Sequence, residues 1–195
     1  MRITRSRQVV DSLIRAVLGQ KVTGREAKTA YARMVRAQGE LAPGPRPDLL
    51  MPPDPEWVAT LDYGDFHPWG VERRRAEVVL EVARRAKRME EALDMSLPDA
   101  YRRITALRGV GPWSAAWVGL QALGDPDAVL VGDFHIPNTV AWALAGEPRA
   151  DDDRMLELLE PFRPHRGRVV NLLKAAGITA PKYGPRSPIR EIRGM

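Results

Sequence analysis

The apolar residues of this 195-residue chain recur with the period of an α-helix. A buried helix face carries apolar side chains at i, i+3, i+4, i+7 and i+8. The chain follows this template near its start, at Val10, Leu13, Ile14, Val17 and Leu18. No stretch alternates for long enough to predict a β-strand, and the apolar run at 128–131 suits a short buried connector. We therefore expect an all-α fold with about eight to ten helices.

Capping and breaking residues mark where the helices begin and end. Thr23 and Glu26 have the spacing of a capping box, and Gly39 is placed to end the helix that they begin. Six prolines between residues 42 and 55 predict an irregular connector. Further helices are expected at residues 55–61, 71–93, 96–107, 136–145, 153–162 and 166–176.

The helix expected at 71–93 carries a dense run of basic side chains. Glu77 and Glu81 lie among them at helical pairing distances, so we interpret the run as a solvated face. Contact with phosphate groups is the alternative interpretation. The basic residues are Arg73, Arg74, Arg75, Arg84, Arg85, Lys87 and Arg88.

Composition narrows the possible functions. Lys and Arg number 30 against 25 Asp and Glu, and the net charge of +5 is consistent with a polyanionic partner. The chain has no cysteine, which excludes disulfides, cysteine-ligated metal centres and a thiol nucleophile. It contains no apolar run of the roughly 18 residues that a membrane span needs, and no signal-peptide core. We therefore expect an intracellular, cytoplasmic protein.

A glycine-rich turn joins two of the expected helices in the stretch LRGVGPWSAAW, residues 107–117. Gly109 and Gly111 permit positive φ and remove side chains from one surface, while Pro112 suits the first position of a helix. Backbone N–H groups at such a helix start can bind a phosphate without a charged side chain. The alternative is an ordinary turn between helices with a glycine cap.

An aspartate lies where it could meet this turn. In VLVGDFHIPN, residues 129–138, an apolar run leads into Gly132 and Asp133, and a helix is expected to begin. Asp133 follows Gly111 by 22 residues, which allows one helix and a connector between them. Asp before a helix is most often a structural cap whose carboxylate accepts backbone N–H groups. Beside a phosphate-binding turn, it is also a candidate for chemistry on a nucleotide.

These motifs resemble the helix-hairpin-helix DNA glycosylase superfamily, in particular the branch of bacterial 3-methyladenine DNA glycosylase II. Residues 107–115 resemble the family's hairpin L-P-G-[VI]-G-x-W-[ST]-A, and Asp133 falls at the spacing of its catalytic aspartate. Residues 16–27 resemble the glutamine-containing turn of the N-terminal lobe. Residues 161–173 resemble the family's late P-x-R helix.

The resemblance implies a single glycosylase domain with two helical lobes flanking a cleft. The lobes would be 24–107, and 1–23 together with 108–176, with a basic tail at 177–195. Such a protein would act in base excision repair at the nucleoid, as a monomer on double-stranded DNA that contains damaged bases. It would flip an alkylated purine from the duplex and hydrolyse its N-glycosidic bond, with no cofactor and no metal.

The resemblance also implies roles for individual residues. Asp133 would be catalytic. Trp113 occupies the position where lyase-competent relatives carry an attacking lysine, so the reaction should stop at an abasic site. The expected base pocket is Trp113, Trp117 and His135, and the expected DNA contacts are Gly109, Val110, Gly111, Trp113, Ser114, Gln20 and Lys21.

Three departures from the family pattern keep two alternatives open. Lys21 replaces the apolar wedge expected after the glutamine, Arg108 replaces the hairpin proline, and no mixed α/β segment precedes the first helix. The first alternative is a helix-hairpin-helix protein that binds DNA without catalysis. The second is a glycosylase for deaminated or oxidised bases.

Overall fold

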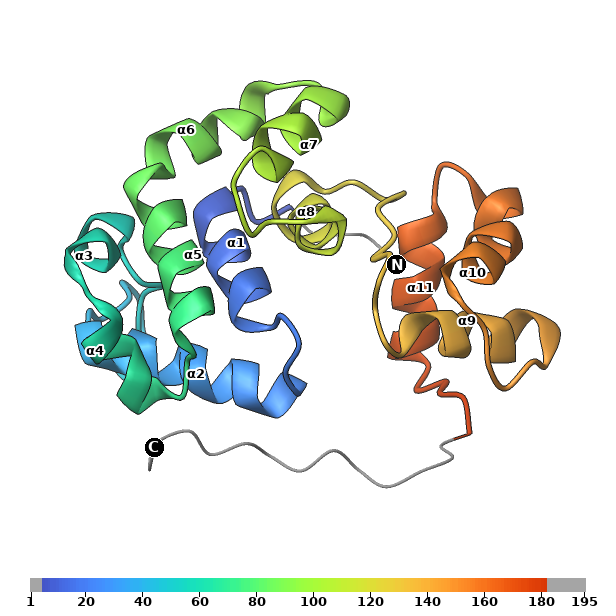
Figure 1. Ribbon diagram of the computed structural model, residues 1–195, viewed down its shortest axis with the longest axis horizontal. Helices are drawn as coiled ribbons and strands as arrows, with labels where there is room; N and C mark the ends of the chain where they lie inside the picture. The colour runs from blue at the N-terminus through green and yellow to red at the C-terminus, as the bar shows by residue number, and fades with distance from the viewer. Residues whose placement is uncertain (1–4, 182–195) are drawn as a thin grey trace.

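The computed structural model describes residues 5–181, which form an all-α fold, as the sequence predicts (Figure 1). Strand-like pairing among these residues is limited to one isolated bridge between Leu41 and Leu50. Most of the expected basic tail lies outside the described residues. The α-helices are α1 Val9–Leu18, α2 Gly24–Gln38, α3 Pro55–Thr60, α4 Tyr63–Phe66, α5 Arg73–Arg84, α6 Ala86–Glu90, α7 Leu97–Thr105, α8 Pro112–Val118, α9 Ile136–Ala145, α10 Asp152–Leu159 and α11 Arg166–Ala175.

Helix ends follow the local sequence signals closely. Thr23 and Glu26 form the expected reciprocal capping box at the start of α2, and Gly39 ends this helix in the left-handed conformation. Ser96 caps α7 through its side chain. The proline-rich connector between α2 and α3 is irregular, as predicted.

The helix predicted over 71–93 is interrupted, and this corrects the sequence-based expectation. The chain leaves helical geometry at Arg85, between α5 and α6, and a 3₁₀ turn follows at Glu91–Asp94. The bend lets α6 bring Glu90 over the start of α1, where its carboxylate accepts the N–H groups of Val9 and Val10 at 3.1 and 2.9 Å. Apolar periodicity alone does not reveal this tertiary contact.

The described residues form two hydrophobic cores that meet at α8. The first core joins α1 to α2, α5 and α7 and includes Val110, Ala115 and Val118. The second core packs Ala116 and Leu120 against α9, α10 and α11, which stand apart from the other helices in Figure 1. The expected division placed residues 1–23 in the second lobe, whereas α1 packs in the first core against α5 and α8. Within residues 5–181, no helix is both long and apolar enough to cross a bilayer.

Candidate functional site

The glycine-rich turn between α7 and α8 folds as a tight hairpin held against α5. The N–H group of Val110 donates to the carbonyl of Leu107 at 3.0 Å, and both side chains are buried in the first core. Gly109 has φ +91°, and a Cβ at this position would lie 2.4 Å from Val78 Cγ2. Glycine is therefore required here by backbone conformation and by packing.

The second glycine of the turn has a different role. Gly111 has φ −102° and ψ −177°, which any residue can adopt, so the sequence-based expectation of positive φ holds for Gly109 but is wrong for Gly111. A Cβ on Gly111 would meet nothing within 4 Å. Pro112 opens α8 as predicted, and the first N–H groups of a helix have no intrahelical acceptor. The open side of Gly111 therefore faces space that a partner could fill.

Gln20, just after α1, holds the hairpin closed. Its Nε2 donates to the carbonyl oxygen of Gly109 at 2.9 Å and to Ser114 Oγ at 3.0 Å. Ser114 and Val110 are both buried, so of the expected DNA contacts these two could act only through their main chain. The Gln20 amide links the loop after α1 to the hairpin, although 89 residues separate Gln20 from Gly109.

Lys21 lies at the tip of the loop between α1 and α2, next to Gln20. Its side chain is exposed, and its φ of +55° is in the left-handed region that few non-glycine residues occupy. The buried Arg75 guanidinium donates to the carbonyl oxygen of Leu18 at 2.8 Å and so fixes the end of α1 beneath this loop. Lys21 is therefore exposed to solvent on a loop whose preceding helix end is fixed by the hydrogen bond from Arg75.

Asp133 lies at the start of α9 and is held from two directions. Its Oδ1 accepts the N–H groups of His135 at 2.9 Å and Ile136 at 3.1 Å. Its Oδ2 accepts the indole N–H of Trp113 at 3.1 Å. The structure thus brings the candidate carboxylate and the hairpin helix α8 together, and the carboxylate remains partly exposed.

Two tryptophans form an aromatic wall beside this carboxylate. The rings of Trp113 and Trp117 are stacked, with centroids 5.7 Å apart and an interplanar angle of 25°. Trp113 also lies against Gly19, where an added Cβ would be 3.6 Å from the ring. Both tryptophans are partly buried at the edge of the second core. The bond to Asp133 and the stack on Trp117 together fix the orientation of the Trp113 ring.

Two further residues near Asp133 were missed by sequence reasoning. Phe134 is 85% exposed, and the ring of His135 packs edge-on against it with centroids 4.9 Å apart. Burial lowers the pKa of Lys174 on α11, and the negative charge of Asp133 opposes this effect. Phe134 directly follows the candidate aspartate and could have been noticed, whereas no sequence signal connects Lys174 with Asp133, 41 positions away.

The loop that leads to Asp133 is anchored to α11 by an ion pair. Asp127 accepts the backbone N–H and Nε of Arg166 at 3.0 and 2.9 Å through Oδ1, and its Oδ2 lies 2.6 Å from the guanidinium. These hydrogen bonds from Arg166 lower the pKa of Asp127. Nearby, the Tyr101 hydroxyl donates to Asp125 Oδ2 at 2.6 Å. In the part of the chain that the structure describes, no three His, Asp or Glu side chains are grouped as metal ligands.

Comparisons of the sequence and of the structure with known proteins both find DNA glycosylases. The sequence matches no family model. It is 25% identical over 161 residues to YfjP of Bacillus subtilis (strain 168), named as a DNA-3-methyladenine glycosylase, covering 80% of this chain and 55% of YfjP. It is 31% identical over 137 residues to AlkA of Mycobacterium tuberculosis, named as a bifunctional transcriptional activator and DNA repair enzyme, covering 69% of this chain. The chain spans 27% of that protein and about half of YfjP.

Solved structures share the fold at low sequence identity. The 3-methyladenine DNA glycosylase of Archaeoglobus fulgidus has a TM-score of 0.74 and 21% identity, over 85% of this chain and 57% of that one. The Mag1 glycosylase of Schizosaccharomyces pombe, in complex with abasic DNA, has a TM-score of 0.76 and 19% identity, over 94% of this chain and 87% of that one. This likeness shows that the chain has the fold of the helix-hairpin-helix DNA glycosylases, and its sequence is similar to proteins named as DNA-3-methyladenine glycosylases.

Proposed function

We propose that the protein is a monofunctional DNA glycosylase that removes alkylated purines from double-stranded DNA by hydrolysis. The observation that carries this proposal is the carboxylate of Asp133, which is held at the start of α9 and bonded to Trp113 on the hairpin helix. The names of the sequence relatives and the shared fold support the same activity. The hairpin would hold a backbone phosphate near the lesion, and the base would be flipped toward the space beside Asp133.

The geometry of Asp133 suits a reaction in which positive charge develops on the sugar. When the N-glycosidic bond breaks, its electron pair leaves with the base, and the sugar becomes oxocarbenium-like. A carboxylate has about four lone-pair positions, and three are taken by His135, Ile136 and Trp113. One position remains to orient a water molecule. The water would add to the sugar carbon and pass its proton to Asp133, leaving an abasic site.

The tryptophan wall suits a cationic base. A purine alkylated on a ring nitrogen carries positive charge, and a cation over an indole face gains about 0.5–2 kcal/mol. Such a base departs as a neutral molecule, so its loss requires no general acid. The stacked rings of Trp113 and Trp117 are the surface on which we expect this base to lie.

The test is a set of duplexes that each carry one damaged base: 7-methylguanine, ethenoadenine, hypoxanthine, uracil or 8-oxoguanine. Each duplex is incubated with the protein and then treated with alkali, which cuts the strand at an abasic site. We expect cutting at the alkylated purines, and no cutting by an Asp133→Asn preparation made in the same way. That variant controls for a contaminating glycosylase.

The two alternatives correspond to distinct outcomes of the same experiment. Binding of duplexes without excision of any base would favour the helix-hairpin-helix protein that has lost catalysis. Excision restricted to uracil, hypoxanthine or 8-oxoguanine would favour the glycosylase for deaminated or oxidised bases. Either result would overturn the proposed substrate class.

A further inference from the structure

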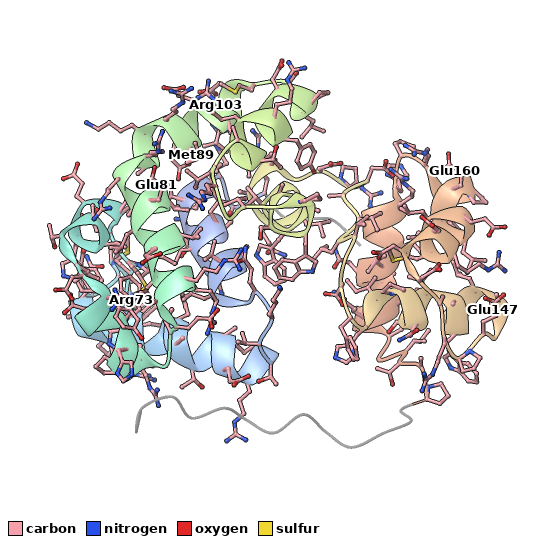
Figure 2. All side chains as sticks on the ribbon, viewed as in Figure 1. Arg73, Glu81, Met89, Arg103, Glu147 and Glu160 are labelled. Carbon is pink, nitrogen blue, oxygen red and sulfur yellow. The ribbon has the colours of Figure 1, made fainter. Side chains whose placement is uncertain are left out.

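A wide groove begins at the hairpin and runs along α5 and α6 on one side and α7 on the other. Its volume is about 1280 Å³, which exceeds the range of about 300–1000 Å³ of small-molecule pockets. Figure 2 labels Glu81, Met89 and Arg103, which line it. Arg108 and Gly109 of the hairpin also line the groove, so the surface proposed to grip phosphate continues directly into it.

The groove is lined by both charged and apolar side chains. The lining includes three acidic side chains, Glu77, Glu81 and Asp99, and twice as many arginines. Apolar side chains lie between them. The arginines are Arg74, Arg85, Arg88, Arg102, Arg103 and Arg108, and the apolar residues are Val78, Met89, Met95, Ala106 and Leu107.

Half of the arginines are already engaged in ion pairs. Arg85 pairs with Glu81, Arg102 with Asp99, and Arg103 with Glu91. These pairs use Glu81 and Asp99 of the groove and Glu91 beside it, whereas Glu77 is not part of them.

The other three arginines have no such partner. Arg74, Arg88 and Arg108 are exposed, and their side chains form no hydrogen bond or ion pair with the described residues. They are placed at the hairpin, on α5 and on α6. Gly109 packs against Val78, one helical turn from Arg74, so Arg74 and Arg108 lie beside the hairpin and Arg88 lies farther along the groove.

We propose that this groove binds the sugar–phosphate backbone of the duplex that flanks the damaged base on one side. The inference rests on the proposed function and extends it, because it states on which side of the hairpin the bound duplex is contacted. Guanidinium groups without acidic partners are the side chains expected to replace counterions along DNA. The groove's continuity with the hairpin favours DNA over an acidic protein segment.

Helix geometry gives the length of this contact. Gly109 of the hairpin packs against Val78 on α5, and Arg88 lies 10 residues beyond Val78. This spans at most about 15 Å at about 1.5 Å per residue, because the chain bends at Arg85, and it corresponds to about 4 base pairs at about 3.4 Å each. Duplex that extends over the groove should therefore add affinity over about 4 base pairs beyond the hairpin, and further extension should add nothing.

The experiment measures binding as the two arms of a duplex are lengthened separately. In one series the arm on one side of the lesion grows from about 5 to about 15 base pairs, and in the other series the opposite arm does. Wild-type protein should gain affinity from one arm only. Arg74→Ala with Arg88→Ala should abolish this gain and lower the slope of log affinity against log salt by about two units on the long duplex.

The matched control is Arg84→Ala with Lys87→Ala. These cations lie on the same two helices, are equally exposed, and do not line the groove. We expect this variant to keep the arm-specific gain and most of the salt slope. A melting curve for each variant verifies that the fold is intact. A second control, Gly111→Val, tests whether the hairpin binds DNA, since this variant should have weakened affinity for duplexes of every arm length.

The outcomes separate this inference from the proposed function. If the Arg74/Arg88 variant keeps the arm-specific gain, or if the Arg84/Lys87 control loses as much, the groove does not bind flanking duplex, even where base excision proceeds normally. An acidic protein partner would then be the remaining explanation for the groove. If wild-type protein binds no duplex of any length, both the proposed function and this inference fail.

Discussion

The indole nitrogen of Trp113 lies 3.1 Å from Oδ2 of Asp133 and donates its proton to it. This bond joins the hairpin helix α8 to the start of α9. The opposite oxygen of the same carboxylate accepts the N–H groups of His135 and Ile136. Because both oxygens are held, the orientation of the carboxylate is set before any substrate arrives, which is the preorganisation that electrostatic catalysis requires.

Replacing the carboxylate should separate catalysis from binding. Asp133→Asn keeps an oxygen that can accept the N–H groups of His135 and Ile136 but loses the negative charge. We expect base excision to fall by about 100-fold or more, with duplex affinity within a few fold of wild type. Single-turnover excision and a binding titration check this. Unchanged excision by a folded variant would remove Asp133 from the mechanism.

Trp113→Phe should slow excision while keeping an aromatic face. The change removes the donor to Asp133 Oδ2, and a hydrogen bond to a charged group contributes about 1.5–3 kcal/mol. The rate should fall by about 10- to 100-fold if this energy serves the transition state. Trp113→Leu should in addition reduce the preference for cationic over neutral bases. Equal preference in the two variants would argue against stacking of the base on this ring.

The protein should not cut DNA strands without alkali. Trp113 replaces the lysine with which lyase-competent relatives attack the sugar, so no Schiff base is expected. Treatment with borohydride during the reaction should trap no covalent adduct on a denaturing gel. A trapped adduct would contradict the monofunctional assignment, and Lys174, whose pKa is lowered by burial near Asp133, would be the first amine to replace.

The two hairpin glycines should respond differently to substitution. Gly109→Ala places a Cβ against Val78 at φ +91°, so we expect a loss of about 1–3 kcal/mol in stability and a lower melting temperature. In Gly111→Val the extended φ is one that valine also adopts and the Cβ meets nothing within 4 Å, so the fold should remain stable.

Gly111→Val thereby becomes a direct probe of DNA binding. It should weaken binding to damaged and undamaged duplexes equally, because phosphate contacts carry no sequence information. Titrations with both duplexes, beside melting curves, measure this. A folded Gly111→Val protein that binds like wild type would mean that the hairpin is only a turn.

The Asp127–Arg166 pair should give stability that depends on pH. Both side chains are largely buried, and Arg166 lowers the pKa of Asp127 from its ordinary value of 3.8. The unfolded chain then binds more protons than the native state in the acid range, so this contribution is complete above the unfolded pKa and is lost as pH falls through the lower, folded pKa. Asp127→Asn should cost about 1–3 kcal/mol at neutral pH.

Melting curves between neutral pH and pH about 3 measure this effect. The difference between wild type and Asp127→Asn should be constant near neutrality and should shrink below the ordinary pKa of Asp127. Asp48→Asn is the matched control, since Asp48 pairs with Arg46 on the exposed connector and should contribute little. A constant difference down to the lowest pH would contradict the assignment.

Local sequence signals determined the all-α class, most helix positions and the candidate hairpin. These signals act over a few residues: the capping box of Thr23 and Glu26, the helix start at Pro112, and the helix end at Gly39. Asp133 could be placed before α9 for the same reason, because an N-terminal cap uses backbone groups only two or three residues away.

Only the tertiary structure decided which residues meet. The break at Arg85 accompanies the contact of Glu90 with α1, and the hydrogen bond from Gln20 to Gly109 joins residues 89 positions apart. The bond between Trp113 and Asp133 spans 20 positions. Such contacts depend on how two helices cross, and this crossing is set by the packing of whole apolar faces, which no local pattern encodes. The sequence thus identifies the candidate catalytic carboxylate, and the packing of α8 against α9–α11 gives it its orientation.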